Sequence, residues 1–161
     1  MSWPTGEIYS GNWKDGKRHG QGKMIYDDDA WYEGEWEGHF MNGKGVLCID
    51  GTRYEGSFVK DKKTGTGNFV DKDGNEYVGE YLNNMFNGKG KCSWKNGDIY
   101  DGNYVNDKKK GHGIYIWGES KCKYDGQWDN DQPNGEGILY DQSGKVVHKG
   151  YWSNGKYSKV P

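Results

Sequence analysis

Large aromatic residues and glycines alternate along the chain in short stretches that are separated by polar pairs. In the stretch Tyr32–Trp36 (YEGEW), two aromatic residues flank Gly34 at every second position. Alternation with a period of two predicts β-strands that bury one face and expose the other. Similar stretches begin at Tyr9, Tyr54, Tyr77, Tyr100 and Tyr124, and a degenerate copy begins at His148.

These stretches recur at a regular period. Their first residues are separated by 23, 22, 23, 23, 24 and 24 positions. In six units a Gly-x-Gly pair follows, and its first glycine lies nine residues after the glycine of the aromatic stretch. A fixed period of this length indicates a repeat protein. We therefore expect residues 1–161 to form a single array, with a half-unit at 1–8 and units that start near residues 9, 32, 54, 77, 100, 124 and 148.

Each unit also contains a residue pair that suits a tight turn. The pairs are Asp15-Gly16, Gly38-His39, Lys60-Asp61, Asn83-Asn84, Asn106-Asp107, Asn130-Asp131 and Asn154-Gly155. Most are Asn, Asp or Gly, which tolerate positive φ at both central positions of a type I′ turn. Each unit is therefore predicted to be a β-hairpin, and turn-like joints between the units predict an antiparallel meander.

Residues that oppose each other across a two-residue turn share one face of the sheet. Counted outward from the fourth turn, the expected partners are Tyr81 with Phe86, Gly79 with Gly88, and Tyr77 with Gly90. The glycines then share a face with the aromatic residues, which leaves room for rings to lie flat over the backbone and to meet rings of the next hairpin. We expect the rings to form the core and the other face to be polar.

Composition agrees with this interpretation. The 25 aromatic residues make up about half of the apolar set, while Ala30 is the only alanine and leucine occurs three times. Because such a chain lacks strong helix formers, almost no helix is expected. The predicted fold is all-β: an elongated single-layer antiparallel array of six to seven hairpins. The net charge of −2 does not favour nucleic acid as a partner.

The repeat, with its YEGEW and Gly-Lys-Gly signatures, resembles the MORN (membrane occupation and recognition nexus) repeat. The resemblance covers nearly the whole chain and implies twisted arrays of hairpins that are usually non-catalytic. It further implies roles in cytoskeletal, ciliary or membrane-junction scaffolds.

No motif predicts a catalytic residue, a metal or a cofactor. His19, His39, His112 and His148 sit at different positions in their units. The stretch Asp71–Glu76 (DKDGNE) begins like a calcium loop, but its glycine is misplaced, which favours an ordinary Asp-Gly turn. Cys92 aligns with apolar positions of the other units and is expected in the core. The odd number of cysteines favours a reducing, cytoplasmic location.

The two residues that follow each turn differ in chemical character from one unit to the next. Basic pairs (Lys17-Arg18, Lys62-Lys63, Lys108-Lys109) alternate with apolar pairs (Phe40-Met41, Met85-Phe86). One interpretation is that the second member of each pair packs on the aromatic rings. The other is that the pairs contact a partner, because Phe40 and Met85 should point to the polar face, where burial is hard to supply.

The first functional hypothesis is a non-catalytic scaffold that docks a protein segment or helix along its aromatic face and hairpin edge. The resemblance implies a cytoskeletal or ciliary assembly as its setting. Its expected contact residues are Trp13, Trp36, Phe40, Met41, Phe58, Tyr81, Met85, Phe86, Tyr104 and Trp128. The alternative is a peripheral module that binds anionic phospholipid through Lys17, Arg18, Lys62, Lys63, Lys108, Lys109 and Lys110. The unprotected start of the sheet predicts a monomer or a dimer joined through the N-terminal end.

Overall fold

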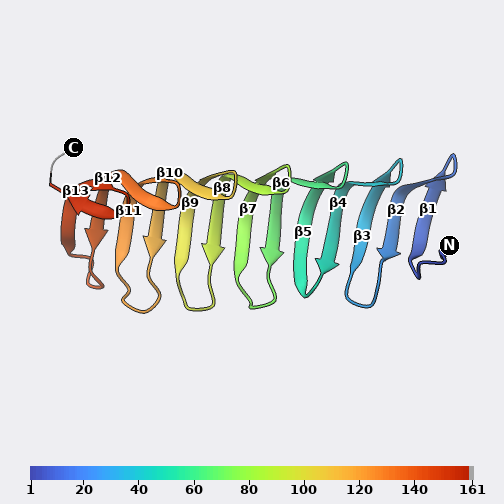
Figure 1. Cartoon of the computed structure of the whole chain (residues 1–161), viewed down its shortest axis with the longest axis horizontal. Helices are drawn as coiled ribbons and strands as arrows, with labels where there is room; N and C mark the ends of the chain where they lie inside the picture. The colour runs from blue at the N-terminus through green and yellow to red at the C-terminus, as the bar shows by residue number, and fades with distance from the viewer. Residues whose placement is uncertain (160–161) are drawn as a thin grey trace. The chain divides into compact units, whose positions relative to one another are not determined.

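The computed structural model describes residues 1–159, which form fourteen β-strands and no helix (Figure 1). The strands follow one another in chain order and run antiparallel. The predicted all-β fold of antiparallel hairpins is therefore confirmed. The aromatic residues and glycines that fill the strands explain why no helix competes with them.

The chain divides into two compact units. The first comprises Met1–Gly74 and Glu80–Asn84, and the second comprises Asn75–Gly79 and the described residues from Met85 onward. The first unit holds β1 (Ile8–Lys14), β2 (Lys17–Ile25), β3 (Trp31–Glu37), β4 (Phe40–Ile49), β5 (Thr52–Val59) and β6 (Lys62–Val70). The second holds β8 (Met85–Ser93), β9 (Ile99–Val105), β10 (Lys108–Ile116), β11 (Lys123–Asp129), β12 (Gln132–Tyr140), β13 (Val146–Ser153) and β14 (Lys156–Ser158). Residues of β7 (Glu76–Leu82) belong to both units, and the single array stays a prediction.

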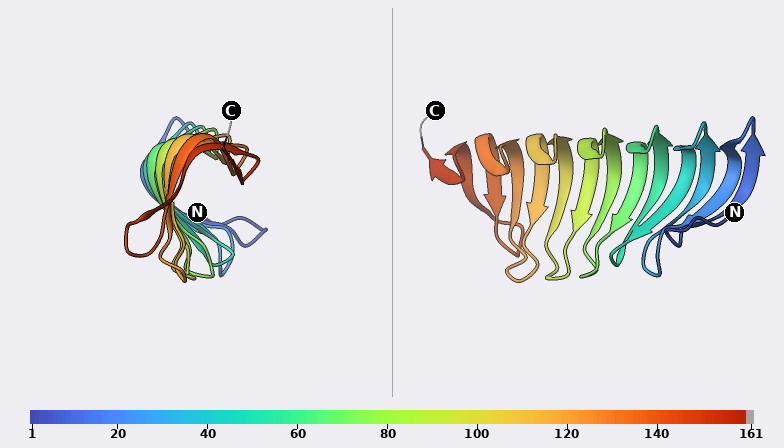
Figure 2. Two further views of the ribbon diagram at one scale, coloured as in Figure 1. Left: turned by 90° about the vertical axis from the view of Figure 1, so that its left-hand side faces the viewer. Right: turned by 45° about the vertical axis from the view of Figure 1, so that its right-hand side comes forward.

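All seven predicted turns are present. Both central residues of each turn have positive φ, as at Asn106 (49°) and Asp107 (67°). This conformation matches the right-handed twist of the flanking strands. In each unit the turns lie along one edge, the turn edge, and the longer joints between hairpins lie along the other (Figure 2).

The register differs from the predicted one at the Gly-x-Gly glycines. Gly11 pairs with Gly22, and Tyr9 with Met24, whereas simple counting gives Gly20 and Gly22 as their partners. A β-bulge around Gly20, whose φ is +67°, inserts two extra residues into β2. Because two is an even number, each side chain stays on its predicted face.

The predicted pairing of Gly79 with Gly88 is wrong for the same reason. The atom nearest to a Cβ added at Gly79 would be the Cα of Gly90. Gly88 has a φ of +105°, which suits a bulge position. The first glycine of each Gly-x-Gly pair therefore supplies the bulge, and the second lies against the glycine of the aromatic stretch.

The leading tyrosine of a hairpin lies flat over this glycine pair. A Cβ at Gly11 or Gly22 would collide with the Tyr9 hydroxyl, which donates a hydrogen bond to the Asn12 carbonyl oxygen at 2.9 Å. Equivalent hydrogen bonds join Tyr32 to Glu35 and Tyr100 to Asn103. The glycines thus give the ring its space, and the hydroxyl fixes the ring's direction.

Rings of successive hairpins meet, as predicted, and the structure shows that these contacts are edge to face. In the first unit the centroids of Tyr9 and Trp36 are 5.5 Å apart, and those of Tyr32 and Phe58 are 5.2 Å apart. In the second unit Tyr100 and Trp128 are 5.3 Å apart. Because each hairpin buries its rings against the next, each unit is stabilised chiefly by contacts between neighbours.

Candidate protein-interaction surface

Most of the predicted contact residues on the aromatic face are buried. These are Trp36, Met41, Phe58, Tyr81, Tyr104 and Trp128, each 9% exposed or less. The indole N–H groups of Trp36 and Trp128 donate to the carbonyl oxygens of Gly22 and Gly113, at 2.9 and 3.0 Å. The structure gives these six side chains a packing role, so only Trp13, Phe40, Met85 and Phe86 keep accessible surface for a partner.

Burial shifts the acid–base properties of the central tyrosines. It raises the pKa of Tyr54 and of Tyr124 to about 12 from the ordinary value of 10.0. Burial also raises the pKa of Tyr104, whose hydroxyl donates a hydrogen bond to the Cys92 sulfur at 3.0 Å. Cys92 is buried, as predicted, and burial raises the pKa of its thiol. These groups are uncharged at neutral pH and belong to the core.

The second residue after the turn packs on aromatic rings at Arg18, Lys63 and Phe86. The Arg18 guanidinium lies 4.5 Å from the Trp36 ring centroid, and the Lys63 ammonium lies 5.0 Å from that of Tyr54. Phe86 stacks on Tyr77 with a centroid separation of 3.7 Å. The predicted register of Arg18 opposite Trp13 is also observed. The packing interpretation of these residues is therefore supported.

Lys109 has the most enclosed basic side chain of this set. Its ammonium group lies 5.5 Å from the ring centroids of Trp94 and Tyr100, and 5.6 Å from those of Tyr115 and Trp128. The side chain is only 16% exposed. Cation–π contacts of this kind stabilise a lysine in place. Lys109 is therefore poorly placed to contact a lipid headgroup.

Four of the seven proposed lipid-contacting residues remain exposed: Lys17, Lys62, Lys108 and Lys110. The Lys110 ammonium lies 3.3 Å from an Asp129 carboxylate oxygen, and the Lys108 ammonium donates to the Asn130 side chain at 2.6 Å. Since Arg18, Lys63 and Lys109 face the rings, the cationic row is shorter than the sequence suggests.

Exposed apolar side chains gather near the turns. In the first unit Phe40 is 45% exposed, Val59 53% and Leu82 50%. In the second unit Val105 is 43% exposed and Met85 is half-buried. We call these five residues the turn-edge apolar set. Sequence reasoning identified Phe40 and Met85 but missed the other three, which directly precede a turn and could have been found as the strand neighbours of the post-turn pair.

The histidines have separate roles. His39 accepts a hydrogen bond from the Arg18 backbone N–H through Nδ1 at 3.3 Å, and His112 lies 2.8 Å from an Asp125 carboxylate oxygen.

Asp71 forms an ordinary turn, because its side chain accepts a hydrogen bond from the Asp73 N–H. Within residues 1–159 no group of three or more His, Cys, Asp or Glu side chains is arranged to hold a metal ion. The same residues contain no helix long and apolar enough to cross a membrane.

Comparison with known proteins agrees with this geometry. The MORN repeat family matches residues 9–30, 32–53, 54–76, 77–99, 100–120 and 124–146. A 44-residue part of the chain is 41% identical to a part of phosphatidylinositol 4-phosphate 5-kinase 1 from Oryza sativa subsp. japonica. That part is 27% of this chain but 6% of the rice protein. The six matched repeats coincide with the hairpins of the structure, and the chain belongs to the MORN repeat family.

Proposed function

We propose that this chain is a non-catalytic protein-binding module whose partner segment contacts the first-unit members of the turn-edge apolar set, Phe40, Val59 and Leu82. The observation that carries the proposal is the exposure of Phe40, Val59 and Leu82, each 45% or more, within one compact unit. Large apolar side chains that stay exposed beside turns commonly mark an interaction site. Lys62, exposed beside Val59 in the register, adds charge for selecting a partner.

The buried rings limit how a partner binds. Trp36, Phe58 and Trp128 are sealed by the rings of neighbouring hairpins, so the proposed contact shifts from the aromatic face to the turn edge. Neighbouring residues of one strand take the two roles: Met41, which is 9% exposed, packs in the core, and Phe40, which is 45% exposed, stays accessible to a partner. The proposed segment or helix therefore lies along the turns. A cytoskeletal or ciliary setting is part of the proposal and rests on the family alone.

A second candidate is contact with an anionic membrane. Its support is the exposed Lys17, Lys62, Lys108 and Lys110, together with the similarity of one short stretch to a rice phosphatidylinositol 4-phosphate 5-kinase. Each lysine near an anionic surface contributes about 1 kcal/mol, but stable attachment usually requires a second anchor. The proximity of Lys110 to Asp129 weakens this candidate further.

Two assays separate the candidates. Sedimentation with vesicles of phosphatidylcholine, with and without phosphatidylserine, measures membrane contact, and salt-sensitive binding that depends on phosphatidylserine would favour the second candidate. Recovery of partners from lysate, compared between the natural chain and a Phe40→Ala/Met85→Ala variant, tests the first. Partner loss in a folded variant, without vesicle binding, supports the protein-binding proposal.

A further inference from the structure

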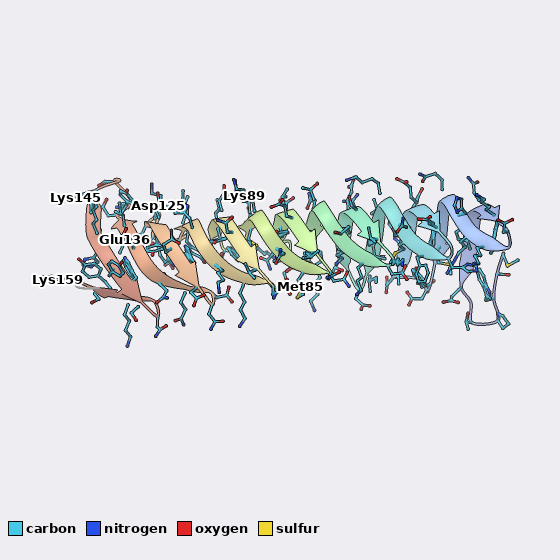
Figure 3. The ribbon with its side chains drawn as sticks, turned by 90° about the horizontal axis from the view of Figure 1, so that it is seen from above. Met85, Lys89, Asp125, Glu136, Lys145 and Lys159 are labelled. Atoms are coloured by element: carbon cyan, nitrogen blue, oxygen red, sulfur yellow. The ribbon has the colours of Figure 1, made fainter. Side chains whose placement is uncertain are left out.

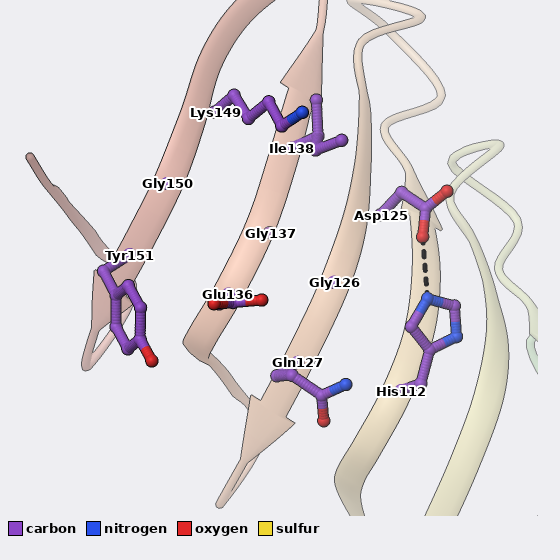
Figure 4. Close-up of a pocket in the computed structure, with 10 residues that line it drawn as sticks. All are labelled: His112, Asp125, Gly126, Gln127, Glu136, Gly137, Ile138, Lys149, Gly150 and Tyr151. Atoms are coloured by element: carbon purple, nitrogen blue, oxygen red, sulfur yellow. Dashed lines mark hydrogen bonds and ion pairs between the residues drawn. The ribbon is translucent and has the colours of Figure 1, made fainter. Parts of the chain in front are cut away.

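A hollow of about 420 Å³ lies over strands β11 to β13, on the face opposite the Tyr124 ring (Figure 4). Its floor is formed by Gly126, Gly137 and Gly150, which lie opposite one another in successive strands. Because glycine has no side chain and Tyr124 covers the other face of the first two, the floor is flat backbone. Figure 3, which looks onto the turns, labels Met85 on one side of the ribbon and Asp125 on the other. The hollow is therefore separate from the Met85 part of the turn-edge apolar set.

Two carboxylates flank this floor. Asp125 pairs with Ile138, and Glu136 is two residues before Ile138 on the same strand, so the two acidic residues are diagonal neighbours across the Gly126–Gly137 pair. Diagonal neighbours of this kind are about 7–8 Å apart. Like charges at this separation repel each other, and a cation placed over the glycines would relieve that repulsion.

The other hairpins do not repeat this arrangement. Glu136 lies ten residues after Gly126, the glycine of its aromatic stretch. At the equivalent position the other hairpins carry Gln21, Lys44, Thr66, Lys89 and His112. Where an acidic residue occupies the position of Asp125, as Glu33, Glu55 and Asp101 do, the diagonal residue is Lys44, Thr66 or His112. An acidic pair across the glycines is thus specific to the hairpin of β11 and β12.

The Glu136 carboxylate is available to bind a cationic group. Within the described residues Glu136 forms no hydrogen bond or ion pair, and its side chain is exposed. His112 occupies one Asp125 oxygen, at 2.8 Å, and lies at the side of the hollow away from Glu136 (Figure 4). Lys149 faces Ile138 and supplies the positive charge at the rim. The hollow is therefore lined by two carboxylates, Asp125 and Glu136, and by one lysine.

We propose that this hollow binds the arginine side chain of a peptide. The planar guanidinium lies over the glycine floor between Asp125 and Glu136, with its donors directed to both carboxylates. Ile138 contacts the methylene stem, and Tyr151, which is 36% exposed, borders the guanidinium with its ring. A lysine ammonium is a compact, strongly hydrated point charge and spans two diagonal carboxylates less well. This site does not depend on the turn-edge proposal.

The test is a titration of the full chain, followed by the backbone amide resonances of Gly126, Gly137 and Gly150. The probe is the blocked tripeptide acetyl-Gly-Arg-Gly-amide, and acetyl-Gly-Lys-Gly-amide is its comparison. Glu136→Gln and Glu136→Lys introduce residues that other hairpins carry at this position, so both variants should fold. The control variant is Glu33→Gln, which removes a carboxylate that already faces Lys23 at 3.2 Å.

The arginine probe should shift the three glycine resonances and bind more tightly than the lysine probe. Glu136→Gln should weaken its binding about threefold, in line with the loss of one exposed ion pair, and Glu136→Lys should remove binding. The control variant should bind as the natural chain does. Absence of arginine binding, equal binding of the lysine probe, or unchanged binding in Glu136→Lys would each overturn the proposal.

Discussion

The side chain of Asp107 accepts a hydrogen bond from the backbone N–H of Phe86 at 2.7 Å, and the Asp107 N–H donates to the Phe86 carbonyl oxygen at 3.0 Å. Two hydrogen bonds thereby join a turn residue of one hairpin to a strand of the hairpin before it. The same reciprocal pair joins Asp61 to Met41 and Asn84 to Lys63. The Asn and Asp residues that permit the turn also connect the repeats.

The contribution of the side-chain hydrogen bond to stability can be tested at Asp107. An asparagine at position 107 keeps a side-chain acceptor and tolerates positive φ, as Asn84 does in its own turn. A glycine at position 107 also tolerates positive φ but removes the side-chain acceptor. We expect Asp107→Gly to lower the free energy of unfolding by about 0.5–1.5 kcal/mol, and Asp107→Asn to change it much less. Urea unfolding measures both. Equal stability of the two variants would show that the side-chain hydrogen bond contributes little.

Substitution of a central glycine should be far more costly. A valine at Gly79 would collide with the backbone of Gly90 and Lys89 and with the Tyr77 hydroxyl. Since backbone cannot move aside as a flexible side chain can, we expect a loss of about 1–3 kcal/mol or more. Gly74→Ala is the control, because its φ is +87° but no atom lies within 4 Å of an added Cβ. Thermal melting compares the two, and an unchanged melting temperature for Gly79→Val would refute the face assignment.

The fold could be predicted because turn pairs and period-two alternation are local signals. The register could not, since counting from a turn assumes a regular ladder, and the bulge at Gly20 depends on how the Tyr9 ring lies over Gly11 and Gly22. A glycine at a fixed offset in every unit was the available signal for that bulge.

The candidate surface was predicted less completely. Alternation placed Trp36 on the aromatic face, but its burial depends on Tyr9 and Arg18 of the preceding hairpin, which a strand pattern does not encode. Phe40 was predicted correctly as an exposed residue because its neighbour Met41 takes the inward position. Val59 was missed because an apolar residue before a turn resembles any strand residue.

Stability should fall at alkaline pH. Burial raises the pKa of Tyr54 and Tyr124 from 10.0 to about 12. A raised pKa in the folded state gives stability that is complete below pH 10 and is lost as the pH rises through about 12, because the unfolded chain ionises first. Melting temperature measured together with tyrosinate absorbance checks this. Full ionisation near pH 10 without unfolding would contradict the burial of these phenols.

Association through the N-terminal end stays a prediction. Trp13 is 39% exposed, whereas Trp36 and Trp128, at the same position of other hairpins, are 3% and 5% exposed. Beside β1, the chain's own Ser2 forms a bridge with Ile8. We expect light scattering to show a monomer or a dimer, and expect Trp13→Ser to shift any dimer toward monomer. An open-ended polymer would contradict this expectation.

The protein-binding claim is tested most directly by one comparison of partner recovery from lysate. The natural chain, Phe40→Ala/Met85→Ala and the control Val78→Ala serve as bait, and circular dichroism first verifies their fold. Val78 is 49% exposed but lies in the middle of its strand, away from the turns. Exposed anchors commonly contribute 1 kcal/mol or more of affinity, a loss of about fivefold when removed. We predict that partners retained by the natural chain and by Val78→Ala are depleted from the double variant. The same set of partners on all three chains would contradict the account.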